Sequence, residues 1–350
     1  MRAAARQPGR RRTEPRRSPS SYWIVVACVA LAASAFYLAL SIQQAFESEA
    51  DERLPAVDAV AGEPPAIVPP PNPTLVPRVG DAVQAAPPPR PGLAPAVGDP
   101  ALRKALEDAA GDEIDHIAVS VRRVSDGRSA SIHGDYQFYA ASTFKLAILY
   151  EAELRHFRGD LEYSDTLTLS DEDRAEDLGT SGQLVFEDDG SITIEHLLEA
   201  MITVSDNASA VALLHLFGGS TVDETLRTLG LDVMSVNHVE LWTTADDLAR
   251  LMEAIYVGEG VGPEERDQMR DLLLRQTIRN GIPGALSKEV KEGLRIGNKT
   301  GTWPGAQHDV AFVEAQSGAY VIAILTDGSY EGWVALQRVA LAAHKSLSET

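Results

Sequence analysis

The order of predicted elements over residues 101–350 constrains the fold more than any other feature. Near its start, HIAVSVRRV and SASIHG alternate apolar and polar residues around Asp126-Gly127, which predicts a β-hairpin. Strand-like patterns return near the end, in LRIGNKTG, HDVAFVEA and AYVIAILTDG, and helical patterns fill the middle. Strands, then helices, then strands predict an α/β (α+β) domain, in which an antiparallel sheet from both chain ends carries a helical insertion.

Several predicted helices carry boundary signals. ALRKALEDAAG predicts a helix that ends at Gly111, and ITIEHLLEAMITV predicts one that Thr193 caps. NASAVALLHLFGG predicts a helix that ends at the glycines 218–219. In TVDETLRTLG, Thr221 and Glu224 have the spacing of a capping box, so we expect a helix to begin there.

An uncharged and mostly apolar run over residues 22–42 is long enough to cross a bilayer as a helix. Seven arginines lie within residues 1–20 and acidic residues follow the run, so the positive-inside rule places the N-terminus in the cytoplasm. A cleaved signal peptide is the alternative, but the run is long for one and no small-x-small site follows it closely. We expect a single-pass plasma-membrane protein with these segments: a basic cytoplasmic tail 1–21, a transmembrane anchor 22–43, a Pro/Ala-rich linker 44–100, and an extracytoplasmic domain 101–350.

The composition of these segments limits the partners. Of 20 prolines, 14 lie between Pro55 and Pro100, which is typical of a linker that is partly polyproline II. Residues 101–350 hold 42 acidic and 21 basic residues, which argues against a nucleic-acid partner. Cys28 is the only cysteine and the eight histidines show no metal spacing, so we expect no intramolecular disulfide, metal or cofactor.

The stretch YAASTFKLAILY places Ser142 three residues before Lys145, at the start of an apolar helix. This spacing puts both side chains on one helix face. A lysine in apolar surroundings has a lowered pKa, and a hydroxyl beside such a base is an activated nucleophile. A helix cap and an unrelated lysine would give the same letters, so the pair alone leaves both interpretations open.

Two further triplets change that balance. VSDNAS contains Ser205-Asp206-Asn207 at the break between two predicted helices. GNKTGTW contains Lys299-Thr300-Gly301 on a predicted strand. Each triplet is weak by itself, but a serine–lysine pair, an SDN triplet and a KTG triplet in this order form a specific set.

On these motifs the chain resembles the penicillin-recognising serine hydrolases, in particular the class A β-lactamases. The resemblance covers about residues 101–350 and extends to AASTFKLAIL, ITVSDNASAVALL, TTADDLARLM and HDVAFVEAQSGAYVIAILTDG. It implies the β-lactamase/transpeptidase-like fold. It also implies that Ser142 attacks a carbonyl to form an acyl-enzyme, that Lys145 accepts or relays its proton, and that Ser205 passes this proton to the leaving nitrogen.

The resemblance also implies a substrate-binding set. Asn207 would hold the substrate's amide side chain, and Lys299 with Thr300 would bind its carboxylate. The backbone N–H groups of Ser142 and Thr302 would form an oxyanion hole, with Gly301 allowing close approach. The expected partner is a small-molecule β-lactam or a cell-wall peptide.

One departure from the family pattern concerns release of the acyl group. Class A enzymes carry a Glu-x-x-Leu-Asn loop between the SDN and KTG elements, and its Glu activates the releasing water. Here LDVMSVNHVELWTT lacks that motif and offers only Glu240 and Asp232. Glu240 is the candidate base, although a solvated loop acid is the commoner role for such a residue. Without a base, acylation can proceed while release stalls.

Three functions therefore stay open. The first is a membrane-anchored serine hydrolase that opens and hydrolyses β-lactams, which are cyclic amides. The second is a D-Ala-D-Ala peptidase or esterase acting on cell wall, and the third is a penicillin-binding sensor that does not turn over. Near the triplets, His308-Asp309 could orient the KTG strand. Arg279 could hold substrate carboxylate or have a structural role at a helix end or in a salt bridge.

Overall fold

The computed structural model describes residues 96–237, 241–289, 293–327 and 332–348. The predicted cytoplasmic tail and anchor, nearly all of the linker, and Glu240 lie outside these ranges. Within them, no helix is both long enough and apolar enough to cross a membrane.

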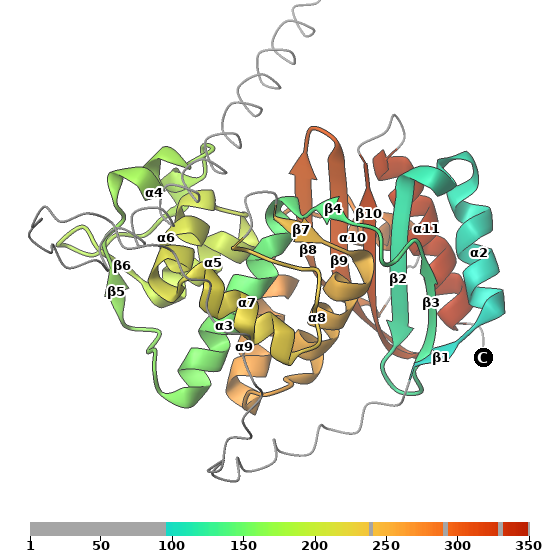
Figure 1. The fold of residues 1–350 in the computed structure, drawn as a ribbon, viewed down its shortest axis with the longest axis horizontal. Coiled ribbons are helices and arrows are strands. Elements are labelled where there is room, and N and C mark those ends of the chain that lie inside the picture. The colour runs from blue at the N-terminus through green and yellow to red at the C-terminus, as the bar shows by residue number, and fades with distance from the viewer. Residues whose placement is uncertain (1–95, 238–240, 290–292, 328–331, 349–350) are drawn as a thin grey trace, which may run out of the picture.

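A six-stranded sheet forms the centre of the fold, in the order β1-β3-β2-β10-β9-β8 (Figure 1). The first three strands come from the N-terminal part of the domain and the last three from its C-terminal part, so the prediction of a sheet from both ends is confirmed. The strands are β1 Val97–Gly98, β2 Ile117–Arg123, β3 Arg128–Ile132, β8 Arg295–Trp303, β9 Ala306–Ala315 and β10 Gly318–Thr326.

The prediction of an entirely antiparallel sheet is wrong at one edge. The ladders β3-β2-β10-β9-β8 are antiparallel, but β1 runs parallel to β3. Val97 N–H donates to Gly127 O, and Asp99 N–H donates to Ser129 O. Only Asp99 separates β1 from the helix α2, which begins at Pro100. The position of the start of α2 therefore sets the direction of β1. The sheet is therefore mixed.

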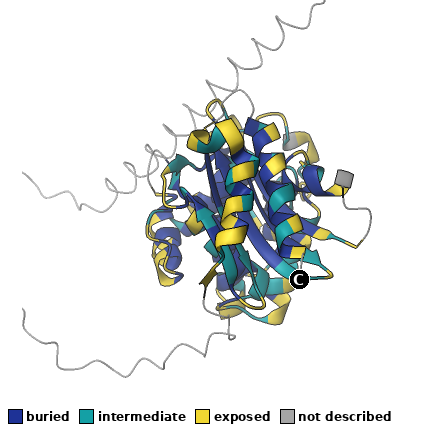
Figure 2. Ribbon diagram, turned by 90° about the vertical axis from the view of Figure 1, so that its right-hand side faces the viewer, coloured by how far each residue is buried: buried dark blue, intermediate teal, exposed yellow. Residues whose placement is uncertain are grey.

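Helices cover both faces of the sheet and also form a lobe beside it (Figure 1). On one face lie α2, α10 and α11, and on the other α8 crosses β2, β10 and β9. Figure 2 shows buried strands behind helices that expose one side to solvent. The helices are α2 Pro100–Ala110, α3 Lys145–Arg158, α4 Asp171–Ala175, α5 Ile194–Thr203, α6 Asn207–Phe217, α7 Gly219–Thr228, α8 Ala245–Val257, α9 Pro263–Leu274, α10 Ile282–Glu289 and α11 Gly332–Ser348.

Short elements connect these helices and strands. There are three 3₁₀ turns in the described residues, and two small ladders join β4 to β7 and β5 to β6. They are η1 Gly111–His116, η2 Ala141–Phe144, η3 Ser181–Gln183, β4 Phe138–Tyr139, β5 Thr166–Leu167, β6 Ile192–Thr193 and β7 Trp242–Thr243.

The sheet separates two hydrophobic cores. On β9, Val310 and Phe312 pack with the helical lobe, whereas Ala311 and Val313 pack with α2, α10 and α11. This alternation is the period of two that HDVAFVEA predicts. It also fixes on which face of the sheet each polar side chain of β9 lies.

Most predicted helix boundaries are confirmed. Gly111 follows the last residue of α2, the Thr193 hydroxyl accepts from His196 N–H at the start of α5, and Gly218 ends α6. The capping box at Thr221 and Glu224 is wrong, because α7 already begins at Gly219.

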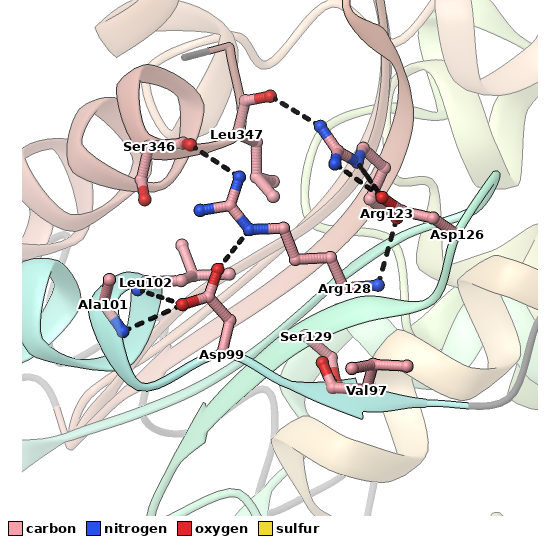
Figure 3. Close-up of polar contacts among 10 residues, drawn as sticks. All are labelled: Val97, Asp99, Ala101, Leu102, Arg123, Asp126, Arg128, Ser129, Ser346 and Leu347. Atoms are coloured by element: carbon pink, nitrogen blue, oxygen red, sulfur yellow. Dashed lines mark hydrogen bonds and ion pairs between the residues drawn. The ribbon is translucent and has the colours of Figure 1, made fainter. Parts of the chain in front are cut away.

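A polar cluster fastens the start of the domain to its end (Figure 3). The Asp99 carboxylate caps α2 by accepting from Ala101 and Leu102 N–H, and it pairs with Arg128 on β3. Arg128 also donates to the carbonyl of Ser346 in α11. Arg128 on β3 therefore joins the start of the first helix, by an ion pair, to the last helix, by a hydrogen bond.

Candidate active site

Ser142 lies in the 3₁₀ turn η2, directly before α3, rather than inside the α-helix itself. The turn is held by the Thr143 hydroxyl, which donates to Ala140 O over 2.6 Å. Ala141 has a φ of 43°, a left-handed conformation that is uncommon for a residue other than glycine. Ser142 is half-buried, whereas its neighbours Ala141 and Thr143 are buried. The turn thus presents Ser142 at the N-terminal end of α3.

Lys145 is the first residue of α3 and is fully buried. Its Nζ donates to Ser205 O over 2.7 Å and to Asn207 Oδ1 over 2.6 Å, and it lies 3.3 Å from Ser205 Oγ. The amine therefore turns inward toward the SDN triplet. It does not extend to solvent, as a lysine at the edge of an apolar helix usually does.

Ser205 occupies the short break between α5 and α6 with a φ of 62°. The break is held by Asp206, whose Oδ1 accepts from Ser209 N–H as the N-cap of α6 and whose Oδ2 accepts from Thr180 Oγ1. Strained backbone of this kind persists where the surroundings fix it, and it is common at functional sites. The turn places both the carbonyl and the hydroxyl of Ser205 beside Lys145.

Lys299 reaches the same hydroxyl from the edge strand β8. It is fully buried, and its Nζ donates to Ser205 Oγ over 2.9 Å and to Thr300 O over 2.9 Å. Ser205 Oγ is therefore a bridge between two buried amines that lie 154 positions apart in the sequence. The structure brings Lys145, Ser205, Asn207 and Lys299 into one hydrogen-bonded cluster.

Gly301 lets β8 lie against the turn that carries Ser142. A Cβ added at this position would lie 2.9 Å from Ala140 O and 3.0 Å from Thr143 Cγ2, closer than real Cβ atoms normally come. Thr300 is buried and Thr302 is exposed. Because β8 is an edge strand, alternate N–H groups along it point away from β9. Gly301 therefore permits a close approach between β8 and the turn that carries Ser142.

The two lysines differ in their electrostatic surroundings. Burial lowers the pKa of Lys145 well below its usual value, the charge of Lys299 lowers it further, and Asp206 opposes both. Burial also lowers the pKa of Lys299, to about 7, against the opposing charge of Asp309. At neutral pH this arrangement favours a neutral Lys145 amine, which can act as a base.

Asn207 begins α6 and is oriented by Lys145. Its Oδ1 accepts from the lysine amine, so its Nδ2 end points away from that amine. This leaves an amide donor at the edge of the cluster, where the resemblance places a substrate amide.

Several residues behind and beside the cluster were missed or only partly identified from the sequence. Thr180 holds Asp206 from a distant loop, and Asn298 bonds both Arg279 and Asp309 behind β8. Arg279 donates to Ile296 O and Asn298 Oδ1, which supports its structural interpretation. No local pattern marks these residues, since their partners are far away in sequence.

His308 is buried, and its ring is committed on both sides. Its Nδ1 accepts from Thr326 N–H over 3.2 Å, so Nε2 carries the proton and donates to Tyr139 O over 2.8 Å. Burial lowers the pKa of His308 to about 4. The ring is therefore neutral at neutral pH and helps to hold the strand that leads into the Ser142 turn.

Glu240 lies outside the described residues, but the segment that follows it is described. Leu241 O accepts from Ala140 N–H over 2.8 Å, and β7 pairs with β4. The chain just after Glu240 therefore runs beside the Ser142 turn. In the described ranges, no group of His, Cys, Asp and Glu could hold a metal ion.

Comparisons with known proteins identify the family of the chain. A model of the "Beta-lactamase enzyme family" matches residues 101–347. Among curated proteins, beta-lactamase FAR-1 of Nocardia farcinica is 30% identical over 242 residues, which cover 63% of this chain and 73% of that protein. Beta-lactamase BRO-1 of Moraxella catarrhalis is 25% identical over 220 residues, covering 59% and 69%.

Solved structures show the same fold. PBP-A superimposes with a TM-score of 0.66 at 23% identity, over 74% of this chain and 100% of that one. A beta lactamase from Xanthomonas campestris superimposes with a TM-score of 0.62 at 19% identity, over 70% and 98%. At these identities the likeness supports the β-lactamase/transpeptidase-like architecture.

Proposed function

The chain belongs to the beta-lactamase enzyme family, and on this premise we propose that it opens and hydrolyses β-lactams through an acyl-enzyme on Ser142. The observation that carries the proposal is the Ser205 hydroxyl, which lies 2.9 Å from one buried lysine amine and 3.3 Å from another. Two amines with lowered pKa values on one hydroxyl form a path for a proton.

The reaction divides into steps that these residues can perform. Lys145, neutral and fixed by Ser205 and Asn207, accepts the proton of the Ser142 hydroxyl as its oxygen attacks the lactam carbonyl. The proton then passes through Ser205 to the lactam nitrogen as the C–N bond breaks. The N–H groups of Ser142 and Thr302 stabilise the developing oxyanion. Lys299 and Thr300 hold the substrate carboxylate, and Asn207 Nδ2 holds its amide carbonyl.

Acylation is tested with the full-length protein and a labelled penicillin. We expect a covalent adduct on the peptide that contains Ser142 and none in Ser142→Ala. Ser129→Ala is the matched control, because β3 lies across the sheet from β8 and the control should label normally. Absence of label in the folded wild type would remove every acyl-enzyme interpretation. PBP-A offers a precedent, since a single-residue mutant of that protein is known as an acyl-enzyme complex with penicillin G.

Release of the label separates hydrolysis from the alternatives. Rapid loss of the adduct supports a β-lactamase, whereas a persistent adduct supports a cell-wall peptidase or esterase, or a sensor. The missing Glu-x-x-Leu-Asn motif favours these alternatives. Glu240→Gln should slow release without slowing acylation if Glu240 activates the water, and an unchanged release rate excludes it from that role.

We also propose that residues 22–43 anchor the protein in the plasma membrane with the enzyme domain outside the cytoplasm. The support is the apolar run at 22–42, the preceding arginines and the linker of residues 44–100. The protein should sediment with membranes, resist extraction by high salt, and be digested by protease added outside intact cells. Recovery of a shortened soluble form that lacks residues 22–43 would support the cleaved-signal alternative.

A further inference from the structure

A buried carboxylate lies behind the strand that carries the KTG triplet. Asp309 on β9 is fully buried. Its Oδ2 accepts from Ile282 N–H at the start of α10 over 2.7 Å, and its Oδ1 accepts from Asn298 Nδ2 over 2.9 Å. A Cβ on Gly281 would overlap Oδ2, so the glycine lets the start of α10 close around the carboxylate. The site is built to hold an oxygen pair in place.

The position of Asp309 relates it to Lys299 through the sheet. In the β8–β9 register Asp309 lies opposite Thr300, the neighbour of Lys299. Asp309 shares the face of Ala311, which packs with α10 and α11, whereas the Lys299 amine reaches Ser205 on the opposite face. The carboxylate and the amine are thus separated by the strand, with no hydrogen bond between them.

The two lysines of the cluster have parallel arrangements. The charge of one buried carboxylate acts to raise the pKa of each amine: Asp206 for Lys145 and Asp309 for Lys299. Each carboxylate is held by a backbone N–H at a helix start and by one uncharged side chain, Thr180 Oγ1 or Asn298 Nδ2. Two positive charges on one hydroxyl are unfavourable, so the cluster must divide its protons unequally.

The other charged groups near Lys299 do not supply this division. Lys145 has the same sign when it is protonated, and it would then oppose the ammonium form of Lys299. His308 is neutral and bonded to Tyr139 and Thr326. Arg279 donates to Asn298 and lies on the Asp309 side of the strand. Among these groups, Asp309 is the one whose charge favours the ammonium form of Lys299. Burial raises the pKa of Asp309 itself to about 6, so this charge is present at neutral pH and is lost as the pH falls through 6.

We propose that Asp309 is a positioning residue that keeps Lys299 as the ammonium of the pair, so that Lys145 is the amine that gives up its proton. This inference rests on the proposed acyl-enzyme function. It assigns distinct tasks to the lysines: one remains charged to bind a substrate carboxylate, and the other remains neutral to act as base. The separation is imposed from behind the sheet by a residue that does not touch substrate.

A direct test follows Lys299 without using activity. The chain has six lysines, so ¹³C-lysine NMR of the full-length protein in detergent can resolve their titrations. In Asp309→Asn we expect the Lys299 transition to move to lower pH by about one unit. Asp108→Asn is the matched control: it removes the partner of exposed Lys104 and should move only the Lys104 titration. An unmoved Lys299 transition would overturn the proposal.

A kinetic test adds the link to binding. The rate of acylation by a penicillin should fall at high pH in the wild type as Lys299 loses its proton. In Asp309→Asn this fall should begin at lower pH, with the rate near pH 6 changed less than twofold. In a Lys299→Arg background the same change should leave the limb in place, because a guanidinium stays charged. An equal loss at all pH values in both backgrounds would mean that Asp309 is only structural.

The two failures can be told apart. If the wild type is never acylated but Asp309→Asn shifts Lys299, the proposed function fails and the electrostatic role stands. If acylation occurs and Lys299 does not shift, this inference alone fails. Should Asp309→Asn not fold, Asp309→Ser also removes the charge while keeping an oxygen acceptor for Ile282 N–H, and it carries the same expectations.

Discussion

Buried ionisable residues outside the hydrogen-bonded cluster are expected to make the stability of this domain depend on pH. Glu153 in α3 is fully buried; its Oε2 accepts from the Tyr163 hydroxyl over 2.7 Å, and its Oε1 has no hydrogen-bond partner. Burial raises the pKa of Glu153 to about 8, and nearby Glu265 and Glu264 act in the same direction. The carboxyl is therefore protonated in the native state at neutral pH.

This protonation predicts a gain in stability for Glu153→Gln. The folded pKa lies above the unfolded value, so the stability from the bound proton is complete below about pH 4.5 and is lost as pH rises toward 8. An uncharged amide avoids that loss, by on the order of 4 kcal/mol at pH 8. Thermal melts should show a higher Tm for the variant at pH 8 and little difference at pH 4.

Exposed Glu172→Gln is the control and should leave Tm unchanged at both pH values. Equal effects of Glu153→Gln at pH 4 and pH 8 would contradict a raised pKa. At this scale the sequence predicted the residues of the motifs, and for their supports it offered only His308-Asp309 beside the KTG strand. Ser142 and Lys145 share one turn, whereas Thr180 and Asp309 act through contacts that only the folded chain creates.

Single elements set the geometry of the cluster, and β8 lies close against η2 at Gly301. Gly301→Ala would place a methyl group against Ala140 O, which belongs to the backbone and cannot rotate away. We expect a loss of about 1–3 kcal/mol in stability, as in overpacked cores. We also expect acylation to fall at least tenfold, because the strand that carries Lys299 must move away from Ser142.

Gly98→Ala provides the comparison, since a Cβ there meets no atom within 4 Å. Normal acylation by Gly301→Ala would show that the close approach is dispensable.

Element boundaries were predicted well where a cap is local, as at Thr193 of α5. They failed at Thr221, because Gly218 lets the helix start earlier. The two-residue strands β1, β4 and β7 are too short to show any period in sequence.

At the scale of the whole domain, both ends of the described chain meet in one cluster. Asp99→Ala removes the cap of α2 and the ion pair to Arg128 together. We expect a cost of about 1–2 kcal/mol, or a Tm lower by roughly 2–8 °C for a domain of this size. Asp99→Asn keeps the cap and loses only the charge, so calorimetry should show a smaller decrease.

A larger decrease in Tm for Asp99→Asn than for Asp99→Ala would contradict this division between the helix cap and the ion pair.

The global layout was predictable because strand patterns lie at both ends of the domain and helical ones between them. The parallel pairing of β1 was not, because strand direction at an edge depends on where α2 starts. That start is fixed by Asp99 and by Arg128, its partner 29 positions away.

The cluster around Asp99 also determines how the domain responds to tension. Residues 1–95 join the domain at this corner, so any pull on them acts first on Val97 and Asp99 (Figure 3). Arg128 transmits part of this force to the end of α11, so the force is not resisted only by the two-residue pairing of β1 with β3. The strand that carries Lys299 is at the opposite edge of the sheet. Mechanical strain therefore enters as far from the reacting groups as the strand order allows.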